Sequence, residues 1–166
     1  MFAWAYSFNQ PIERWNVSNV YNMRAMLYFV KSFNQPLNSW NVSNVYTITC
    51  MFGGAKSFNQ PLNDWDVSNV ENMVQMFDDA SSFNQPLDRW DVSKVKDMTC
   101  MFYGATSFRQ PVTAWKLRGK QRGVFSSICP TTVIWSRASC VLPRLTGTIG
   151  NMNFMTRYGF TARNTV

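Results

Sequence analysis

The chain contains no histidine, and only 15% of its 166 residues are charged. Without an imidazole, neither a Ser-His or Cys-His nucleophile pair nor a His-ligated metal site can form. A Gly-rich phosphate loop and the GxSxG nucleophile motif are also missing from the sequence. We therefore expect that the protein is not an enzyme and that it uses no cofactor and no metal ion.

Two further shortages concern apolar runs and acidic residues. No apolar run approaches the roughly 20 residues that a membrane-spanning helix needs. Residues 116–166 contain no Asp or Glu and carry a net charge of +8, whereas residues 1–115 carry a net charge of −1, which together give the +7 of the whole chain. The basic character of the protein therefore belongs to its C-terminal part alone.

The first 115 residues consist of one unit that returns every 25 residues. The motif SFNQP begins at Ser7, Ser32, Ser57 and Ser82, and the variant SFRQP begins at Ser107. Three side chains recur at fixed positions of the unit, namely Phe8, Phe33, Phe58 and Phe83; Asn9, Asn34, Asn59 and Asn84; and Trp15, Trp40, Trp65 and Trp90. A unit this short cannot bury its own apolar residues, so the copies must stack on one another as a solenoid.

Two hydrophobic periods alternate within each unit. Trp65 and Val67 alternate with Asp64 and Asp66, which indicates a short strand. Apolar residues then follow at helical spacings over residues 70–80, which indicates a short helix. The sequence therefore predicts a repeat solenoid with one short parallel β-strand and one short helix in every 25-residue coil, followed by an irregular tail.

The segment FNQPLNDWDVSNVENMVQMF at Phe58–Phe77, together with its copies, resembles the BspA-like leucine-rich-repeat surface proteins. The same 25-residue unit occurs in mycoplasma surface lipoproteins, and the resemblance covers residues 1–115. It implies a leucine-rich-repeat-like solenoid on secreted or cell-surface proteins that serves adhesion or protein binding. It implies no catalytic residues.

The fixed polar and aromatic positions allow two interpretations each. We expect the Asn side chains to be buried and their amides to bond to the turn backbone of adjacent coils, and the alternative is that they bind a ligand. We expect the Trp side chains to form a ladder in the core, and the alternative is an exposed platform for sugars or bases. Acidic residues that differ between copies indicate a solvated surface, with weak Ca²⁺ binding as the alternative; they are Asp64, Asp66, Asp78, Asp79, Asp88 and Asp91.

The cysteines do not suggest a disulfide framework or a zinc site. Cys50 and Cys100 occupy the same position of the unit two coils apart, which places them roughly 10 Å from each other in a parallel stack. A disulfide needs Cα atoms within about 7 Å, so we expect these two thiols to stay free.

The candidate partner-binding residues flank the Trp positions and differ from copy to copy. They are Arg14, Asn16, Ser39, Asn41, Asp64, Asp66, Arg89 and Asp91. The alternative is that this strand face is merely solvated. The sequence NVS at Asn16 and Asn41 is also an N-glycosylation acceptor if a eukaryotic cell secretes the chain.

The sequence divides into two parts at Trp115. Residues 1–115 form about four and a half repeats, and we expect this solenoid to be uncapped at its N-terminus because the chain starts inside a repeat without a signal peptide. We interpret residues 116–166 as a disordered tail or an artefact of the gene prediction, with a functional basic region and an unusual cap as alternatives.

These observations lead to two hypotheses about function. The first is a non-catalytic surface or extracellular module, part of a longer protein, that binds a protein or another cell-surface macromolecule and no small-molecule substrate. The alternative is a peripheral scaffold that binds an anionic membrane or nucleic acid through the basic tail.

Overall fold

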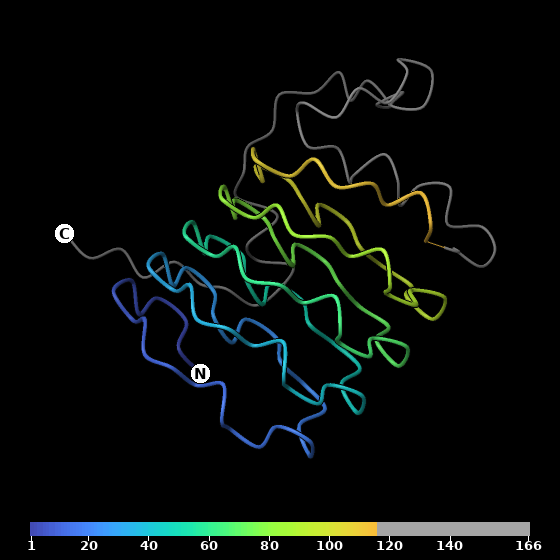
Figure 1. Ribbon diagram of the computed structural model, residues 1–166, viewed down its shortest axis with the longest axis horizontal. Helices are drawn as coiled ribbons and strands as arrows, with labels where there is room; N and C mark the ends of the chain where they lie inside the picture. Colours follow the sequence, from blue (N-terminus) through green and yellow to red (C-terminus); the bar gives the residue numbers. More distant parts are fainter. Residues whose placement is uncertain (116–166) are drawn as a thin grey trace, which may run out of the picture.

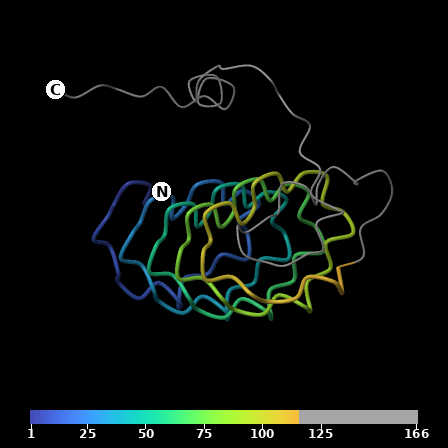
Figure 2. The same ribbon diagram turned by 90° about the horizontal axis from the view of Figure 1, so that it is seen from above.

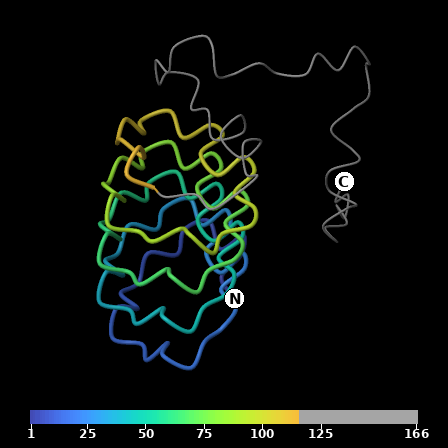
Figure 3. The same cartoon turned by 90° about the vertical axis from the view of Figure 1, so that its right-hand side faces the viewer.

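Residues 1–115, which are the residues that this computed structural model describes, wind into coils stacked one on another (Figure 1). From the side, the coils follow one another in chain order from the N-terminus to residue 115 (Figure 3). Equivalent residues of adjacent repeats lie side by side, since the Tyr46 amide bonds to the Tyr21 carbonyl at 2.9 Å and the Glu71 amide to the Tyr46 carbonyl at 2.8 Å. One repeat is therefore one coil. The predictions for residues 116–166 lie outside the described residues.

The secondary structure inside the coils differs from the prediction. Residues 1–115 contain no helix, and their β-structure consists of isolated parallel bridges, Asn22–Thr47, Thr47–Asn72 and Asn72–Asp97. The leucine-rich-repeat-like solenoid with a short strand and a short helix per coil is therefore wrong. The coils stack on one another, but each coil is built almost entirely from turns.

Where the sequence predicted a helix, the chain forms successive turns. The side chains at the ends of these turns point into the core. The amide of Met76 bonds to the carbonyl of Met73 at 3.2 Å, and that of Ala80 to the carbonyl of Phe77 at 3.1 Å. All four residues are buried. A turn closed between residues i and i+3 brings its two flanking side chains together. The apolar spacing of three and four therefore came from successive turns, which mimic the period of a helix.

Left-handed backbone conformations exclude a helix at these positions. The first set of residues with positive φ is Ala25, Cys50, Gln75 and Cys100, with φ of 52–55°. The second set, four residues further along each coil, is Trp4, Phe29, Gly54, Asp79 and Gly104, with φ of 54–70°. A right-handed helix cannot include such residues. Every coil thus reverses its backbone twist twice within a few residues.

We call residues 22–29, 47–54, 72–79 and 97–104 the turn face. On this face every second backbone amide bonds to the next coil. In the third coil the donors are Met73, Gln75, Phe77 and Asp79, and their acceptors are the carbonyls of Asp97, Thr99, Met101 and Tyr103, at 2.7–2.9 Å. Intervening amides close local turns, as Met76 does to Met73. Backbone pairing between coils is therefore maintained without a regular sheet.

Side chains make the connection on the tryptophan side of each coil. The indole Nε1–H groups of Trp40, Trp65 and Trp90 donate to the carbonyls of Ile12, Leu37 and Leu62 of the preceding coil, at 2.9–3.2 Å. These three indoles are buried, whereas Trp15 in the first coil is 43% exposed. Trp65 and Val67 therefore lie in the core without the predicted strand ladder, and indole hydrogen bonds join the coils there.

The asparagines of the SFNQP motif bind the backbone of the following coil. The side-chain Oδ1 atoms of Asn9, Asn34 and Asn59 each accept the amide of the Asn 25 residues later, at 2.9 Å. Asn84 accepts the amide of Arg109 in the same way. These asparagines are exposed or half-buried, so the expected burial is wrong. Each asparagine side chain therefore joins two coils at the edge of the stack. We call this hydrogen bond the asparagine clasp.

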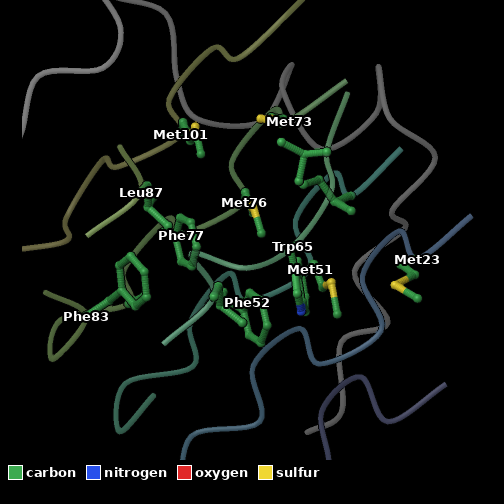
Figure 4. Packing of buried hydrophobic residues seen from close by; sticks show 14 of the residues in the cluster. Met23, Met51, Phe52, Trp65, Met73, Met76, Phe77, Phe83, Leu87 and Met101 are labelled. Carbon is green, nitrogen blue, oxygen red and sulfur yellow. The ribbon is translucent and has the colours of Figure 1, made fainter. Parts of the chain in front are cut away.

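One continuous core runs through all the coils, which form a closed outline when seen from above (Figure 2). Its phenylalanines stack along the chain, with ring centroids 6.0 Å apart for Phe33–Phe58 and for Phe58–Phe83. A second set stacks beside it, at 5.6 Å for Phe52–Phe77, as the close view of the interior shows (Figure 4). The core is therefore made of repeated layers of the same side chains.

Left-handed turns and a helix predict opposite effects of a glycine substitution on the free energy of unfolding. Replacing Ala25 by Gly should raise the free energy of unfolding by up to about 1 kcal/mol, because glycine relieves the left-handed strain. In a helix the same change would lower it by about 1 kcal/mol. Ala114, whose φ is not positive, gives the control: Ala114→Gly should not stabilise the chain. Urea unfolding followed by tryptophan fluorescence measures both, and destabilisation by Ala25→Gly would contradict the backbone described here.

The asparagine clasp gives a second prediction. In Asn59→Ala, the Asn84 amide loses its acceptor, and we expect a loss of about 1–2 kcal/mol in the free energy of unfolding. The matched control is Asn19→Ala, which removes an exposed asparagine for which the structure shows no hydrogen bond within residues 1–115. Equal unfolding midpoints for the two variants would show that the clasp adds nothing.

Candidate functional site

The predicted partner-binding residues form one exposed row beside the buried tryptophans, which we call the tryptophan row. Its members are Arg14, Asn16, Ser39, Asn41, Asp64, Asp66, Arg89 and Asp91, and all eight are exposed. They come from four successive coils at equivalent positions. The structure therefore brings the sequence-predicted residues together on one side of the stack.

Half of the tryptophan row is fixed by local structure. The side-chain Oδ1 atoms of Asn16, Asn41, Asp66 and Asp91 accept the amides of Ser18, Ser43, Ser68 and Ser93, at 2.9–3.2 Å. Such Asx turns accept only Asn or Asp, which explains the narrow choice of residues at this position. In the two NVS sequences the serine hydroxyl also donates to the asparagine Oδ1, at 2.7 Å.

Two further members of the row, Asp64 and Arg89, make polar contacts between coils, as do residues next to the row. Arg89 forms an ion pair with Asp64 at 2.8 Å, and both side chains remain more than half exposed. The Nδ2 of Asn38 also donates to Asp64, and the Nδ2 of Asn63 donates to Asp88 at 3.0 Å. Exposed ion pairs contribute little to stability, typically below about 1 kcal/mol. These side chains are therefore free to exchange their contacts for those of a partner.

A second surface, which the sequence did not predict, lies on the turn face. Successive coils place Tyr28-Phe29, Gly53-Gly54, Asp78-Asp79 and Tyr103-Gly104 at the same two positions of the unit. Few positions of the repeat change their chemistry so strongly. The variation is visible in the aligned repeats, but the sequence predicted a helix over residues 70–80 and a merely solvated surface at Asp78 and Asp79.

Aromatic rings of one coil lie over the glycines of the next. A Cβ atom at Gly53 would lie 2.9 Å from the Tyr28 ring, and a Cβ at Gly54 would lie 2.9 Å from the Phe29 ring. Trp4 stacks on the opposite side of Phe29, with ring centroids 4.6 Å apart. The two glycines are buried under these rings. The result is an aromatic cluster of half-buried or exposed rings, which pack directly on the backbone of the two glycines.

An acidic pair follows in the next coil. Burial and the neighbouring carboxylate of Asp79 raise the pKa of Asp78 to about 6, although a hydrogen bond from Gln75 at 2.7 Å opposes the shift. Burial also raises the pKa of Tyr28 to about 12, with smaller contributions from Cys50, Asp78 and Asp79. The turn face thus carries a partly buried carboxyl group with a raised pKa in the same stack of coils as the aromatic rings.

The thiols and acids of the described residues do not form a reactive or metal-binding centre. Cys50 and Cys100 are free cysteines, and burial raises the pKa of Cys50 to about 11 and also raises that of Cys100. Within residues 1–115, no group of three or more Cys, Asp and Glu side chains could hold a metal ion. The same part of the chain has no helix that is long and apolar enough to cross a membrane.

The acidic pair predicts how stability depends on pH. Because the pKa of Asp78 is about 6 when folded and 3.8 in its ordinary state, the folded chain binds this proton more tightly. The contribution of this group to stability should therefore rise as the pH falls from about 7 to about 4. Asp78→Asn should be more stable than the wild type at pH 7 and lose this dependence, whereas Asp88→Asn should retain it. Unfolding midpoints in urea at pH 7 and pH 5 measure the effect. The same change of midpoint between the two pH values in the wild type and in Asp78→Asn would contradict the prediction.

Comparison with known proteins identifies a family and gives no further match. No curated protein and no solved structure matches the chain. The family described as "Mycoplasma protein of unknown function, DUF285" matches residues 1–73 and again residues 37–127. The two matches overlap because the 25-residue repeat aligns in more than one register, and together they include every complete repeat. On these residues, the chain belongs to the mycoplasma repeat family DUF285.

Proposed function

We propose that the chain is a non-catalytic binding module of a surface or extracellular protein, and that it recognises another protein as the BspA-like surface proteins do. The observation that carries the proposal is the separation of two kinds of position. Buried layers and backbone bonds repeat in every coil, while exposed positions on the tryptophan row and the turn face differ between coils. A constant frame that displays changing side chains is suited to recognition.

The frame also lowers the entropic cost of binding. Neighbouring coils hold the backbone beneath both surfaces, through backbone hydrogen bonds on the turn face and through indole hydrogen bonds on the tryptophan side. A partner then has to order only exposed side chains, which costs about 0.5–1.5 kcal/mol for each long side chain. A stack of coils therefore favours a broad contact made of many small contributions.

The chemistry of the described residues supports a role without catalysis. The thiols are held in the protonated form by burial, and the chain has no histidine that could act as a base. Among the described acids, Asp78 has a clearly raised pKa and accepts a hydrogen bond from Gln75, and the neighbouring thiols of Cys50 and Cys100 have raised pKa values that keep them protonated. The alternative role of the basic tail concerns residues 116–166, which are outside the described part, and no observation on residues 1–115 favours it.

The proposal is tested with the full chain immobilised on a biosensor and with surface proteins biotinylated on intact cells of the encoding organism. We expect saturable binding that is lost when those proteins are digested with protease. Charge reversal in the tryptophan row, Arg14→Glu with Arg89→Glu, should weaken the signal about tenfold if this row makes the contact. Lys94→Glu with Lys96→Glu makes the same charge change at other exposed positions and serves as the control.

Two results would reject the proposed function. One is the absence of saturable binding by a correctly folded chain. The other is binding that survives protease digestion, which would point to a lipid or a glycan. Antibodies against the chain should also label intact cells, and labelling only after permeabilisation would reject the surface location.

A further inference from the structure

We propose that the outer edge of the first coil binds a free segment of another protein that carries the same 25-residue repeat. We call residues 7–21 the first edge, which lies at the N-terminal end of the stack (Figure 3). Every later coil packs with its equivalent edge against the coil before it. The contact does not use the variable side chains of the tryptophan row or the turn face, so it goes beyond the proposed function.

Hydrogen-bond donors at fixed positions join each later coil to the coil before it. In the second coil, three of these donors reach carbonyls of residues 1–21 at 2.9–3.2 Å; they are the amides of Ser32 and Tyr46 and the indole Nε1 of Trp40. The amide of Asn34 is a further donor, and its acceptor is the side chain of Asn9. The equivalent donors of the first edge make no hydrogen bond within residues 1–115; they are the amides of Ser7, Asn9 and Tyr21 and the indole Nε1 of Trp15.

The rings of the first edge are also less covered than their equivalents in later coils. Trp15 is 43% exposed, whereas Trp40 is 4% exposed. Phe8 is half-buried, whereas Phe33, which stacks on it, is completely buried. Five of the seven exposed large apolar side chains of residues 1–115 lie in the first 21 residues; they are Met1, Trp4, Tyr6, Trp15 and Tyr21. A segment laid on the first edge would therefore remove apolar surface from water.

The first coil shows what a partner must supply, because it supplies the same groups to the second coil. These groups are the carbonyls of Tyr6, Ile12 and Tyr21, the side-chain Oδ1 of Asn9 and the ring of Phe8. A segment that reads SFNQP, an aliphatic residue, two variable residues, Trp, one variable residue and VSNV would place these groups at the same spacing. A partner without the repeat would leave the covered donors without acceptors, which is unfavourable. The first edge therefore selects for the repeat sequence.

A second copy of the chain does not offer such a segment. The asparagines of its later coils are already engaged, since the Oδ1 atoms of Asn34 and Asn59 accept amides of the following coil at 2.9 Å. The first edge of a second copy would bring the same donors again. The partner should therefore present the repeat as a segment that is not yet stacked and that becomes ordered when it binds.

The experiment measures the binding of a synthetic peptide to the full chain by fluorescence anisotropy. The peptide has the sequence of residues 31–46, from the residue before SFNQP to the residue after VSNV, and carries fluorescein at its N-terminus. We expect saturable binding of one peptide per chain, and no saturable binding of a peptide with the same residues in scrambled order. In the peptide, Asn34→Ala should weaken binding roughly tenfold because the Asn9 amide loses its acceptor, whereas Asn34→Asp, which keeps the oxygen, should bind like the unchanged peptide.

Two variants of the chain locate the contact. Trp15→Arg places a charge in the first edge and should weaken peptide binding at least tenfold. Tyr103→Arg makes the same kind of change at an exposed aromatic residue in the last of the described coils, and it should leave binding unchanged. The thermal midpoint of each variant checks that it is folded. Sedimentation velocity of the chain without peptide measures self-association.

Several results would overturn the inference. These are the absence of saturable binding up to about 1 mM peptide, equal binding of the scrambled peptide, and a loss of binding in Tyr103→Arg as large as that in Trp15→Arg. A dimer of the chain that is lost in Trp15→Arg and excludes the peptide would make a second copy the occupant of the first edge. The biosensor experiment with surface proteins tests the tryptophan row separately, so the failure of this inference and the failure of the proposed function are distinguishable.

Discussion

The structure depends on backbone hydrogen bonds that join each coil to the next at every second residue of the turn face. In the first full coil, the amides of Met23, Ala25 and Leu27 bond to the carbonyls of Thr47, Thr49 and Met51. Each donor thus lies 24 residues before its acceptor. One inserted or deleted residue would leave a whole row of buried backbone groups without partners, at a cost of about 1–3 kcal/mol for each group. This constraint explains why the repeat keeps a length of 25 residues in every copy.

The same constraint decides which side chains can vary. Residues at turn ends, such as Met73 and Phe77, point into the core and are held to a narrow range of volumes because the interior is closely packed. Asn59 and Asp66 are exposed but satisfy backbone amides, so their chemistry is also restricted. Residues such as Ser39 and Asp78 do neither, and only these can change between coils without disturbing the stack.

The repeat length, the buried columns and the asparagine contacts could be predicted from the sequence because they follow from recurrence. Phe33, Trp65 and Leu87 recur and are buried. The helix could not be excluded in this way, because turns closed over three residues give almost the same apolar spacing as a helix. Gly54 and Gly104 were the available signal for left-handed backbone, but Phe29 and Asp79 at the same position concealed it. The error also hid the turn face, since a helix would have placed Asp78 and Asp79 on an unremarkable outer side.

The two exposed surfaces differ in how freely they can adapt to a partner. On the tryptophan row, every second residue is tied to an Asx turn and is confined to Asn or Asp. On the turn face, backbone groups of adjacent coils bond to one another, so the side chains at the positions of Asp78 and Tyr103 are not needed as backbone acceptors. An aromatic pair, a glycine pair and an acidic pair can therefore succeed one another on the same backbone. Where Phe29 or Asp79 replaces glycine, the left-handed backbone costs roughly 1–2 kcal/mol, so the turn face tolerates these changes because the backbone bonds between coils compensate for the strain.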